Sequence, residues 1–372
     1  MNIFDEMNRR GHEQVVFCSE PKAGLNAIIA VHNTSLGPSL GGVRMWTYAT
    51  TDEALRDVLR LSRGMTYKAA IAGLNLGGGK AVIIGDPNKD KTEALFRTYG
   101  RFVEGLGGRY ITAEDVGTTV REMEWVRLET KYVTGTSRAL GGSGDPSPVT
   151  ALGVFVGMKA CAHEVYGSDS LKGKTVIVQG AGNVASYLCS HLKKDGAKIV
   201  VTDIFEAKAK KLARTVKATY VKPEKIYSIR GDIFAPCALG GILNNDTIPQ
   251  LKVRIIAGGA NNQLLDEKTH MQMLTERGIL YAPDYAINAG GLMNVANELE
   301  GYSAEKALKQ AEGIYDIVRA IFARAKAENI PTSVAANRLA EARIESVSRI
   351  KQIYAGKSEF AGRFGERTRG GR

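Results

Sequence analysis

The sequence has few cysteines and no long apolar run, and each of these absences excludes a class of protein. The four cysteines form no C-x-x-C pair and their spacing fits no zinc site, so we expect reduced thiols and no bound metal. No apolar run approaches the roughly 18–20 residues that cross a bilayer. The first residues also lack the basic and apolar segments of a secretory signal. We therefore expect a cytoplasmic protein with no membrane partner.

A concentrated basic stripe is also missing, although the chain is basic overall. Its 50 Lys and Arg residues against 39 Asp and Glu residues give a formal net charge of +11 over 372 residues. The excess is scattered among acidic residues, apart from a glycine-rich basic tail at residues 356–372 that we expect to be mobile. Nucleic-acid-binding proteins show a basic stripe or a reading motif. The sequence therefore predicts no nucleic-acid partner.

What the sequence does contain is an alternation of apolar strands and helices. In the second half of the chain, strands predicted at residues 175–179 and 198–202 flank a helix predicted at residues 183–194. Such alternation is typical of a parallel sheet with helices on both faces. Further on, apolar periodicity predicts two long helices, at residues 304–327 and 335–353.

The length and these elements predict an α/β protein with two domains flanking a cleft, at about 100–200 residues per domain. Residues 1–140 would form the first domain. Residues 141–334 would form the second, of the Rossmann type, with a doubly wound parallel sheet. Residues 335–355 would pack back on the first domain.

The strongest local motif begins at Gly180, directly after an apolar strand, and opens a helix. Gly180 permits a tight turn, Gly182 lets the backbone approach a pyrophosphate, and the small Ala185 allows close packing of helix and strand. The pyrophosphate would then lie at the helix N-terminus. Asp203 ends the next strand, where a carboxylate accepts from the ribose hydroxyls and repels a 2′-phosphate, which favours NAD over NADP. The alternative is a glycine turn without a cofactor.

Two lysines lie near a second glycine cluster in the first domain. Lys68 would lie just past a helix predicted at residues 52–63, and Lys80 closes a glycine-rich loop predicted at residues 76–80. One lysine could pair with a substrate carboxylate as a fixed cation. The other, held neutral by the positive charge of the first and by burial, could serve as a base. The alternative is two solvated surface charges. A phosphate-binding P-loop is disfavoured because the G-x-x-x-x-G-K-[ST] spacing is absent.

Polar residues also follow two predicted strands at the points where those strands end. Asp115, beside Glu114, could be a working carboxylate or the cap of the next helix. Asn262, beside Asn261, could recognise a carboxamide or ribose, or could simply form a turn.

Several segments together resemble the NAD-dependent amino acid dehydrogenases, and most closely the leucine dehydrogenases. The resemblance runs from about residue 13 to about residue 344, and its most specific stretches include Gly64-Met-Thr-Tyr-Lys68 and Gly73-Leu-Asn-Leu-Gly-Gly-Gly-Lys80. It is carried by residues 12–18, 36–42, 64–68, 73–80, 111–118, 235–239 and 281–291.

The resemblance implies reversible oxidative deamination of L-leucine and other branched-chain L-amino acids to 2-oxo acids and ammonium, with NAD as cofactor. It also implies that residues 1–140 bind the substrate and form the contacts of a homo-oligomer, an octamer in this family, and that residues 141–334 bind NAD. The partner molecule would be a small amino acid or 2-oxo acid. One alternative is the same chemistry with valine, phenylalanine or tryptophan as preferred substrate. Others are another two-domain Rossmann dehydrogenase and a non-enzymatic NAD-sensing or nucleic-acid-binding protein.

The resemblance further implies roles for individual residues. Lys80 would be the general base that activates water, Asp115 would assist proton transfer, and Lys68 would bind the substrate carboxylate. The rest of the substrate site would be formed by Leu40, Gly41, Gly42, Ala113, Asn262, Leu292 and Val295. The cofactor would be bound by Gly180, Gly182, Asn183, Val184, Asp203, Ala257, Asn262 and Asn288. Leucine dehydrogenases often have valine at the position of Leu292, so the pocket here would be smaller and valine or 2-aminobutyrate would compete with leucine.

Overall fold

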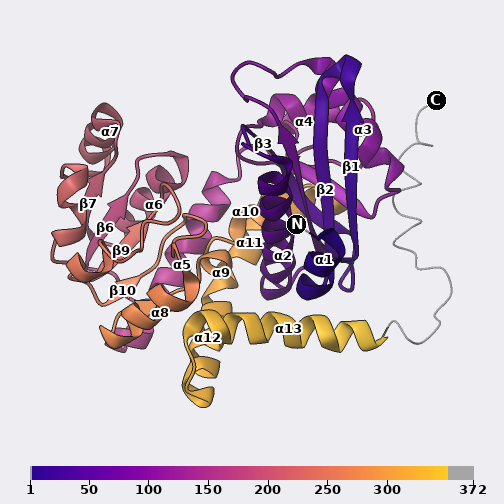
Figure 1. Ribbon diagram of the computed structural model, residues 1–372. Coiled ribbons are helices and arrows are strands. Elements are labelled where there is room, and N and C mark those ends of the chain that lie inside the picture. Colours follow the sequence, from indigo (N-terminus) through magenta and orange to yellow (C-terminus); the bar gives the residue numbers. More distant parts are fainter. Residues whose placement is uncertain (1, 351–372) are drawn as a thin grey trace.

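The computed structural model describes residues 2–350 and has two α/β domains, each built on one sheet (Figure 1). The first sheet has the strand order β1-β2-β4-β3-β5 and the second the order β11-β10-β9-β6-β7-β8. The predicted fold class, with its doubly wound parallel sheet, is confirmed. The boundary between residues 140 and 141 stays a prediction, and the predicted tail at residues 356–372 lies outside the described residues.

The first sheet is mixed, and its two faces are covered by different helices. Strand β2 is antiparallel to β1 and β4, whereas β3 is parallel to β4 and β5. Alternate residues of β2 point to opposite faces, so that Ile28 packs with helix α2 and Ile29 packs with helices α3 and α4. The elements are α1 (Ile3–Arg10), β1 (Gln14–Glu20), β2 (Leu25–Asn33), β3 (Ser39–Trp46), α2 (Thr51–Ile71), β4 (Gly77–Ile84), α3 (Glu93–Gly105), β5 (Tyr110–Glu114) and α4 (Val120–Arg127).

All strand pairs of the second sheet are parallel, and the chain winds outward from its centre in both directions. The path runs from β6 through β7 to β8, then returns to β9 beside β6 and continues to β11. This order makes a switch point between β6 and β9, the place where open α/β sheets bind ligands. The elements are α5 (Ser147–Tyr166), β6 (Thr175–Gln179), α6 (Asn183–Lys194), β7 (Lys198–Thr202), α7 (Glu206–Val216), β8 (Thr219–Tyr220), β9 (Ile233–Pro236), β10 (Ile255–Ile256), α8 (Glu267–Glu276) and β11 (Leu280–Tyr281).

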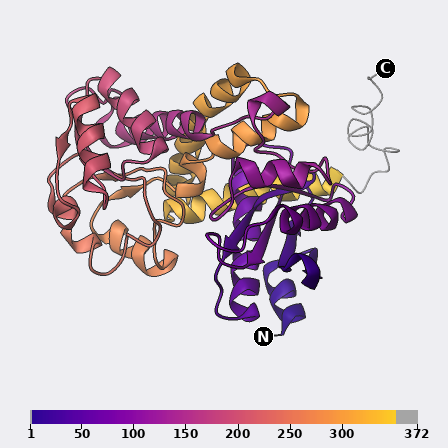
Figure 2. The same cartoon turned by 90° about the horizontal axis from the view of Figure 1, so that it is seen from above.

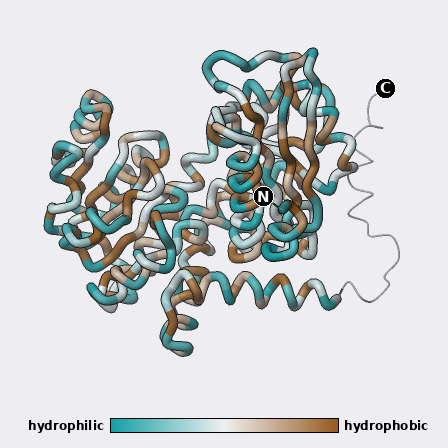
Figure 3. Tube along the Cα trace, in the orientation of Figure 1, coloured by the Kyte–Doolittle hydropathy of each residue, from teal (hydrophilic) through white to brown (hydrophobic). Residues whose placement is uncertain are grey.

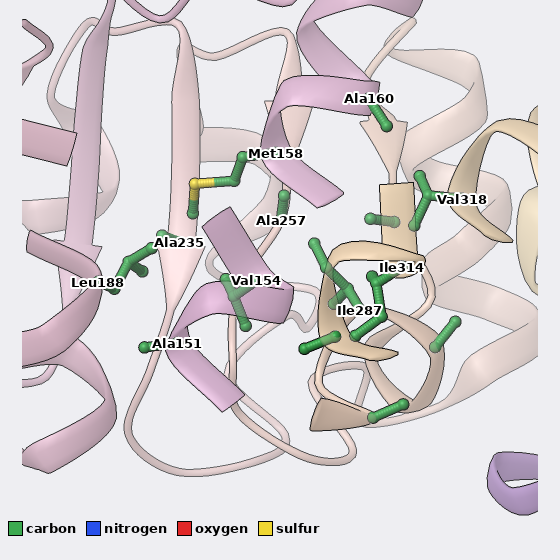
Figure 4. Close-up of a cluster of buried hydrophobic side chains, with 14 of the residues drawn as sticks. Ala151, Val154, Met158, Ala160, Leu188, Ala235, Ala257, Ile287, Ile314 and Val318 are labelled. Atoms are coloured by element: carbon green, nitrogen blue, oxygen red, sulfur yellow. The ribbon is translucent and has the colours of Figure 1, made fainter. Parts of the chain in front are cut away.

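Helix α5 has no single apolar face, since apolar residues occur all around it. This suits its position, buried between the second sheet and the C-terminal helices. Figure 4 shows Val154 and Met158 of this helix among side chains from the sheet and from the helices that follow it. Those helices, α9 (Asp284–Ile287), α10 (Gly290–Ala296), α11 (Ala304–Glu312) and α12 (Ile314–Glu328), all contact α5. Seen from above, the orange and yellow helices gather where the two domains meet (Figure 2). Apolar stretches follow the strands, and the outer loops are largely hydrophilic (Figure 3).

The last described helix, α13 (Thr332–Ile350), returns to the first domain and contacts α2. The Tyr67 hydroxyl donates to Glu341 Oε1 at 2.7 Å. Arg343 donates to the carbonyl oxygen of Leu74 at 2.7 Å and to that of Ala70 at 3.3 Å, so it caps the end of α2. Short 3-10 helices occur at Pro21–Ala23, Arg138–Leu140, Pro223–Ser228, Ile248–Gln250 and Asn297–Glu300.

Three local predictions were wrong. The helix predicted at residues 304–327 is interrupted at Gly313, a residue that is unfavourable inside a helix. The loop predicted at residues 76–80 is mostly strand, because β4 pairs with a strand on each side and this pairing includes its glycines. Lys68 does not lie beyond its helix but inside α2.

Candidate active site

Lys80 and Asp115 form an ion pair at the centre of the first sheet, in which Lys80 is buried and Asp115 is half-buried. Lys80 lies on β4 and is only 4% exposed, and its Nζ is 3.1 Å from Oδ1 of Asp115, which directly follows β5. Strand β3 runs between these two strands, and a Cβ on Gly42 of that strand would lie 2.9 Å from the Cβ of Asp115. Because Gly42 has no side chain, the Asp115 carboxylate can reach across β3 to Lys80.

The ion pair changes the charge behaviour of both residues. Burial lowers the pKa of Lys80, although the Asp115 carboxylate opposes this effect. Burial raises the pKa of Asp115, but Lys80 and Arg44 outweigh it and hold the pKa below its ordinary value. Asp115 therefore remains ionised, while Lys80 gives up its proton more readily than a free lysine. A buried lysine of this kind is a candidate general base.

Arg44 is a component of this site that the sequence analysis missed. Its Nε donates to Oδ2 of Asp115 at 2.9 Å, and its Nη1 donates to Oδ2 of Asp57 at 3.0 Å. Arg44 lies two residues after Gly42 on β3, and therefore on the same face of the sheet. That spacing was the available signal. The alternative interpretation of Asp115 as a helix cap is wrong, because Thr119 caps α4.

Lys68 links the first domain to the second. Its Nζ donates to Oδ1 of Asn288 at 2.6 Å, and Nδ2 of Asn288 donates to Oδ1 of Asn261 at 2.6 Å. Burial lowers the pKa of Lys68 to about 8, although the buried carboxylate of Asp284 opposes this effect. Asp284, which the sequence analysis also missed, accepts from the backbone N–H of Gln263 at 3.0 Å. The structure thus brings Lys68 and Asn288 together.

The residues predicted to form the apolar pocket come from both domains. Leu40 on β3 and the pair Leu292 and Val295 on α10 are buried in one apolar cluster. Ala113 is buried on β5 opposite Gly42, outside that cluster.

Two further predicted site residues differ in exposure. Gly41 packs against the backbone of β4, where a Cβ would overlap the carbonyl oxygen of Gly79. Asn262 is exposed and has a left-handed backbone conformation, with φ of +50°. Of the predicted substrate-binding residues, Leu40, Leu292 and Val295 are thus brought together in one buried cluster, while Asn262 lies at the surface.

The predicted dinucleotide loop has the backbone geometry that its motif requires. Gly180 has φ of +118°, and a Cβ there would lie 2.8 Å from the carbonyl oxygen of Cys237. Gly182 caps the N-terminus of α6, and no protein atom lies within 4 Å of the position its Cβ would take. Asn183 and Val184 form the first turn of α6. The open side of Gly182 therefore leaves room for a phosphate at a helix N-terminus beside the switch point.

Asp203 and Ala257 have their side chains committed to other contacts. Oδ2 of Asp203 accepts from the backbone N–H of Ala181 at 2.7 Å, and Oδ1 accepts from that of Phe205 at 2.8 Å. The carboxylate therefore orders the glycine loop. The side chain of Ala257 is fully buried in the core (Figure 4), so only its backbone is available to a ligand.

Two findings concern the part of the chain that the structure describes. Within residues 2–350, His, Cys, Asp and Glu residues are nowhere grouped in threes or more in a way that could hold a metal ion. Across the same residues, helices that combine the length and the apolar character of a membrane span are absent.

Comparison with known proteins gives matches over nearly the whole chain. The family model described as "Glu/Leu/Phe/Val dehydrogenase, dimerisation domain" matches residues 12–132, and "Glutamate/Leucine/Phenylalanine/Valine dehydrogenase" matches residues 141–204 and 200–352. The leucine dehydrogenases of Thermoactinomyces intermedius and Geobacillus stearothermophilus are 58% and 59% identical over 354 residues, which cover 95% of this chain and 96% of each relative. The crystal structure of L-tryptophan dehydrogenase from Nostoc punctiforme has a TM-score of 0.83 and 51% identity, and the match covers 93% of this chain and all of that one.

Proposed function

The chain belongs to the Glu/Leu/Phe/Val dehydrogenase family, and from this premise we propose how its residues perform the oxidative deamination of L-leucine with NAD. The resemblance drawn from the sequence motifs is confirmed, and the protein is an amino acid dehydrogenase of the leucine dehydrogenase type. The observation that carries the assignment of roles is the ion pair between buried Lys80 and Asp115. Lys68 lies in the same domain and donates to Asn288 of the second domain.

Substrate binding in this proposal uses one charge and one apolar pocket. The Lys68 ammonium pairs with the substrate carboxylate, which takes over from Asn288 Oδ1 as its acceptor. The substrate side chain enters the apolar region near Leu40 and Leu292, where each buried methylene contributes about 0.8 kcal/mol. A charged side chain would lose its hydration there without gaining a partner, so aliphatic amino acids are preferred.

The chemical step in this proposal depends on a neutral Lys80. The chemistry that a bound pyridine nucleotide supplies is the removal of the α-hydrogen with its electron pair, which leaves an iminium on the substrate. Lys80 then takes a proton from water, and the hydroxide adds to the iminium carbon. The Asp115 carboxylate stabilises the protonated Lys80 ammonium and helps return that proton to the nitrogen. The hydroxyl proton of this adduct passes back to Lys80 as the C–N bond breaks, so that ammonia leaves and the carbonyl of the 2-oxo acid forms.

The choice of NAD over NADP is supported by the surroundings of Asp203. This carboxylate accepts from the backbone of the glycine loop, which puts a negative charge where a 2′-phosphate would lie. The two residues that follow are Ile204 and Phe205, so the sequence has no arginine there to pair with that phosphate.

Assembly and location complete the proposal. The first domain, which we place at residues 1–140, would form the contacts of a homo-oligomer, an octamer as the family resemblance implies. The description of its matched family model as a dimerisation domain supports this. The four free cysteines support a reducing compartment, the cytoplasm.

The test of the proposed function is NADH formation, followed by absorbance, with leucine and NAD at alkaline pH. We expect kcat/KM to be higher for leucine, valine and isoleucine than for alanine or glutamate, and higher with NAD than with NADP. The Lys80→Ala variant is the control. A higher kcat/KM for phenylalanine or tryptophan would replace leucine as the substrate, and a preference for NADP would overturn the role of Asp203.

A further inference from the structure

We propose that Arg44 is a positioning residue for the reaction, which holds the Asp115 carboxylate against Lys80 and is itself held in place by Asp57. The inference rests on the proposed function, because it assumes that Lys80 and Asp115 handle protons. It goes beyond that function by extending the working site along the same face of the sheet to helix α2, to residues that do not touch the substrate.

The two oxygens of Asp115 are bound by two different cations. Oδ1 lies 3.1 Å from Lys80 Nζ, and Oδ2 accepts from Arg44 Nε at 2.9 Å. With both oxygens occupied, the carboxylate cannot rotate without breaking a charge-assisted hydrogen bond. The backbone N–H of Asp115 also donates to the Thr118 hydroxyl at 2.9 Å, so the main chain is fixed as well. Loss of Arg44 would remove the hydrogen bond to Oδ2, and the carboxylate could then rotate.

Arg44 is in turn fixed at its far end by helix α2. Its Nη1 donates to Oδ2 of Asp57 at 3.0 Å, and the Tyr48 hydroxyl donates to the same oxygen at 2.8 Å. Arg60 donates to the other oxygen of Asp57 at 2.9 Å. The side chains of Arg44 and Asp57 are only 20% and 17% exposed, so their charges are weakly screened by solvent.

Lys80, Asp115, Arg44 and Asp57 form a row of charges of alternating sign, and each charge acts on the next. Burial lowers the pKa of Lys80, Asp115 raises it, and Arg44 lowers it further. Without Arg44, the negative charge of Asp115 would no longer be partly balanced by a second cation. The pKa of Lys80 would then rise, and Lys80 would keep its proton to higher pH. The titratable and charged groups that interact electrostatically with Lys80 or Asp115 are Lys68, Arg44, Asp57, Tyr48, Tyr110 and Glu114.

A pocket gives solvent access to the Arg44 and Asp57 end of this row, and neither Lys80 nor Asp115 lines it. It has a volume of about 500 Å³, and its lining includes Arg44, Trp46, Tyr48 and Asp57. A small planar cation could therefore enter the space that an Arg44→Ala substitution leaves.

The first experiment measures kcat and the KM for leucine in Arg44→Met and Arg44→Lys. We expect Arg44→Met to lower kcat by ~10–100-fold, since a small misplacement of a catalytic group can cost that much, with less than about a threefold change in KM. Arg44→Lys should recover part of the loss because it keeps the charge. Arg60→Met is the matched control, since it also removes a cation from Asp57 but does not touch Asp115. A loss in Arg60→Met equal to that in Arg44→Met would overturn the proposal.

The second experiment compares the pH dependence of kcat in Arg44→Met and Asp57→Asn. Activity requires neutral Lys80, so a higher Lys80 pKa moves the acid limb of the profile to higher pH. We expect this alkaline shift in Arg44→Met and the opposite shift in Asp57→Asn, because the Asp57 charge raises the pKa of Lys80. A structural role alone would lower the melting temperature without moving the limb in opposite directions. An unmoved limb in both variants would therefore refute the inference.

The third experiment is rescue of Arg44→Ala by millimolar guanidinium chloride. We expect kcat to rise with guanidinium in this variant, and not in Lys80→Ala or with sodium chloride at equal ionic strength. Lack of rescue, in a variant whose melting temperature matches the wild type, would count against the positioning role. If the wild-type protein forms no NADH with leucine, the proposed function fails instead, so the two failures are distinguishable.

Discussion

In the function proposed above, the two halves of the site recognise their ligands by different means. The first domain presents two charged side chains, buried Lys80 and half-buried Asp115, which alter each other's pKa. The second domain presents backbone, at Gly180 and Gly182, with an open helix N-terminus. Charges act over distance and depend on pH, whereas backbone contacts depend on shape. Substitutions in the first domain should therefore change kcat and its pH profile, and those in the glycine loop should change cofactor binding at every pH.

The largest effect should come from Lys80. Replacement of Lys80 by alanine should lower kcat by ~10²–10⁴, because the base is lost, while the KM for NAD stays near the wild-type value. Lys89→Ala is a suitable control, since the side chain of Lys89 is 80% exposed. Steady-state kinetics with leucine and NAD measure both values. If kcat fell by less than about tenfold, the base would have to be another group, with Asp115 the first candidate.

The next effect concerns Lys68 and has a definite sign with pH. Lys68 must be charged to bind a carboxylate, and its pKa is lowered to about 8 by burial. The kcat/KM for leucine should therefore fall above about pH 8, whereas kcat, which depends on neutral Lys80, should not fall with it. Lys68→Ala should raise the KM for leucine by ~10–100-fold, the range for a lost charge-assisted hydrogen bond.

Lys68→Arg is the control for this assignment, because arginine stays charged throughout the accessible pH range. The fall above pH 8 should disappear in that variant. If kcat/KM declines in the same way in wild type and Lys68→Arg, another group titrates there. The acid limb of kcat should also move less in Lys68→Ala than in Arg44→Met, because the nearest charges that act on Lys80 are those of Asp115 and Arg44.

The same contrast explains what could be predicted from the sequence. The strands at 175–179 and 198–202 and the helix at 183–194 were predicted to the residue, since an apolar run and a glycine spacing are local signals. The contact between Arg44 and Asp115 spans 71 positions and depends on the pairing of β3 with β5. The spacing of Arg44 from Gly42 indicates which face of the sheet Arg44 lies on, but nothing local to either residue identifies Asp115 as its partner.

The triple glycine shows how a local rule can fail. Its clustering predicted a loop, but the glycines belong to β4, where each is needed for close packing. A Cβ on Gly79 would lie 2.6 Å from the Tyr110 ring, and one on Gly78 would overlap the backbone of Thr66. Glycine is required there because of neighbours distant in the sequence, and the pairing of three strands overrides its low strand propensity.

A substitution at Gly182 tests the backbone half of the comparison. Gly182→Ala adds a methyl group where no protein atom lies within 4 Å, so the melting temperature should be unchanged. The methyl group would occupy the space through which a pyrophosphate approaches, and the KM for NAD should rise by about tenfold or more. The acid limb of kcat should not move. Gly105→Ala is the matched control, because it is equally open and lies far along the chain from the loop. An unchanged KM for NAD in Gly182→Ala would remove the loop from the cofactor site.

The smallest effect should be at Leu292, where the two halves meet in one apolar cluster with Leu40. Leu292→Ala removes apolar volume from α10 without touching a charge, so the pH profile should remain that of the wild type. The larger cavity should favour longer side chains, and the ratio of kcat/KM for phenylalanine to that for leucine should rise by about tenfold, since one or two methylenes in an apolar pocket are worth that much.

Val156→Ala is the control, because Val156 is a partly buried side chain of α5 packed against the same cluster but was not predicted to face the substrate. If Val156→Ala changed the ratio equally, the effect would arise from loosened packing of the cluster. If Leu292→Ala left the ratio unchanged, the pocket would have to be formed by other residues, with Leu40 of the first domain and Val295 of α10 the first candidates.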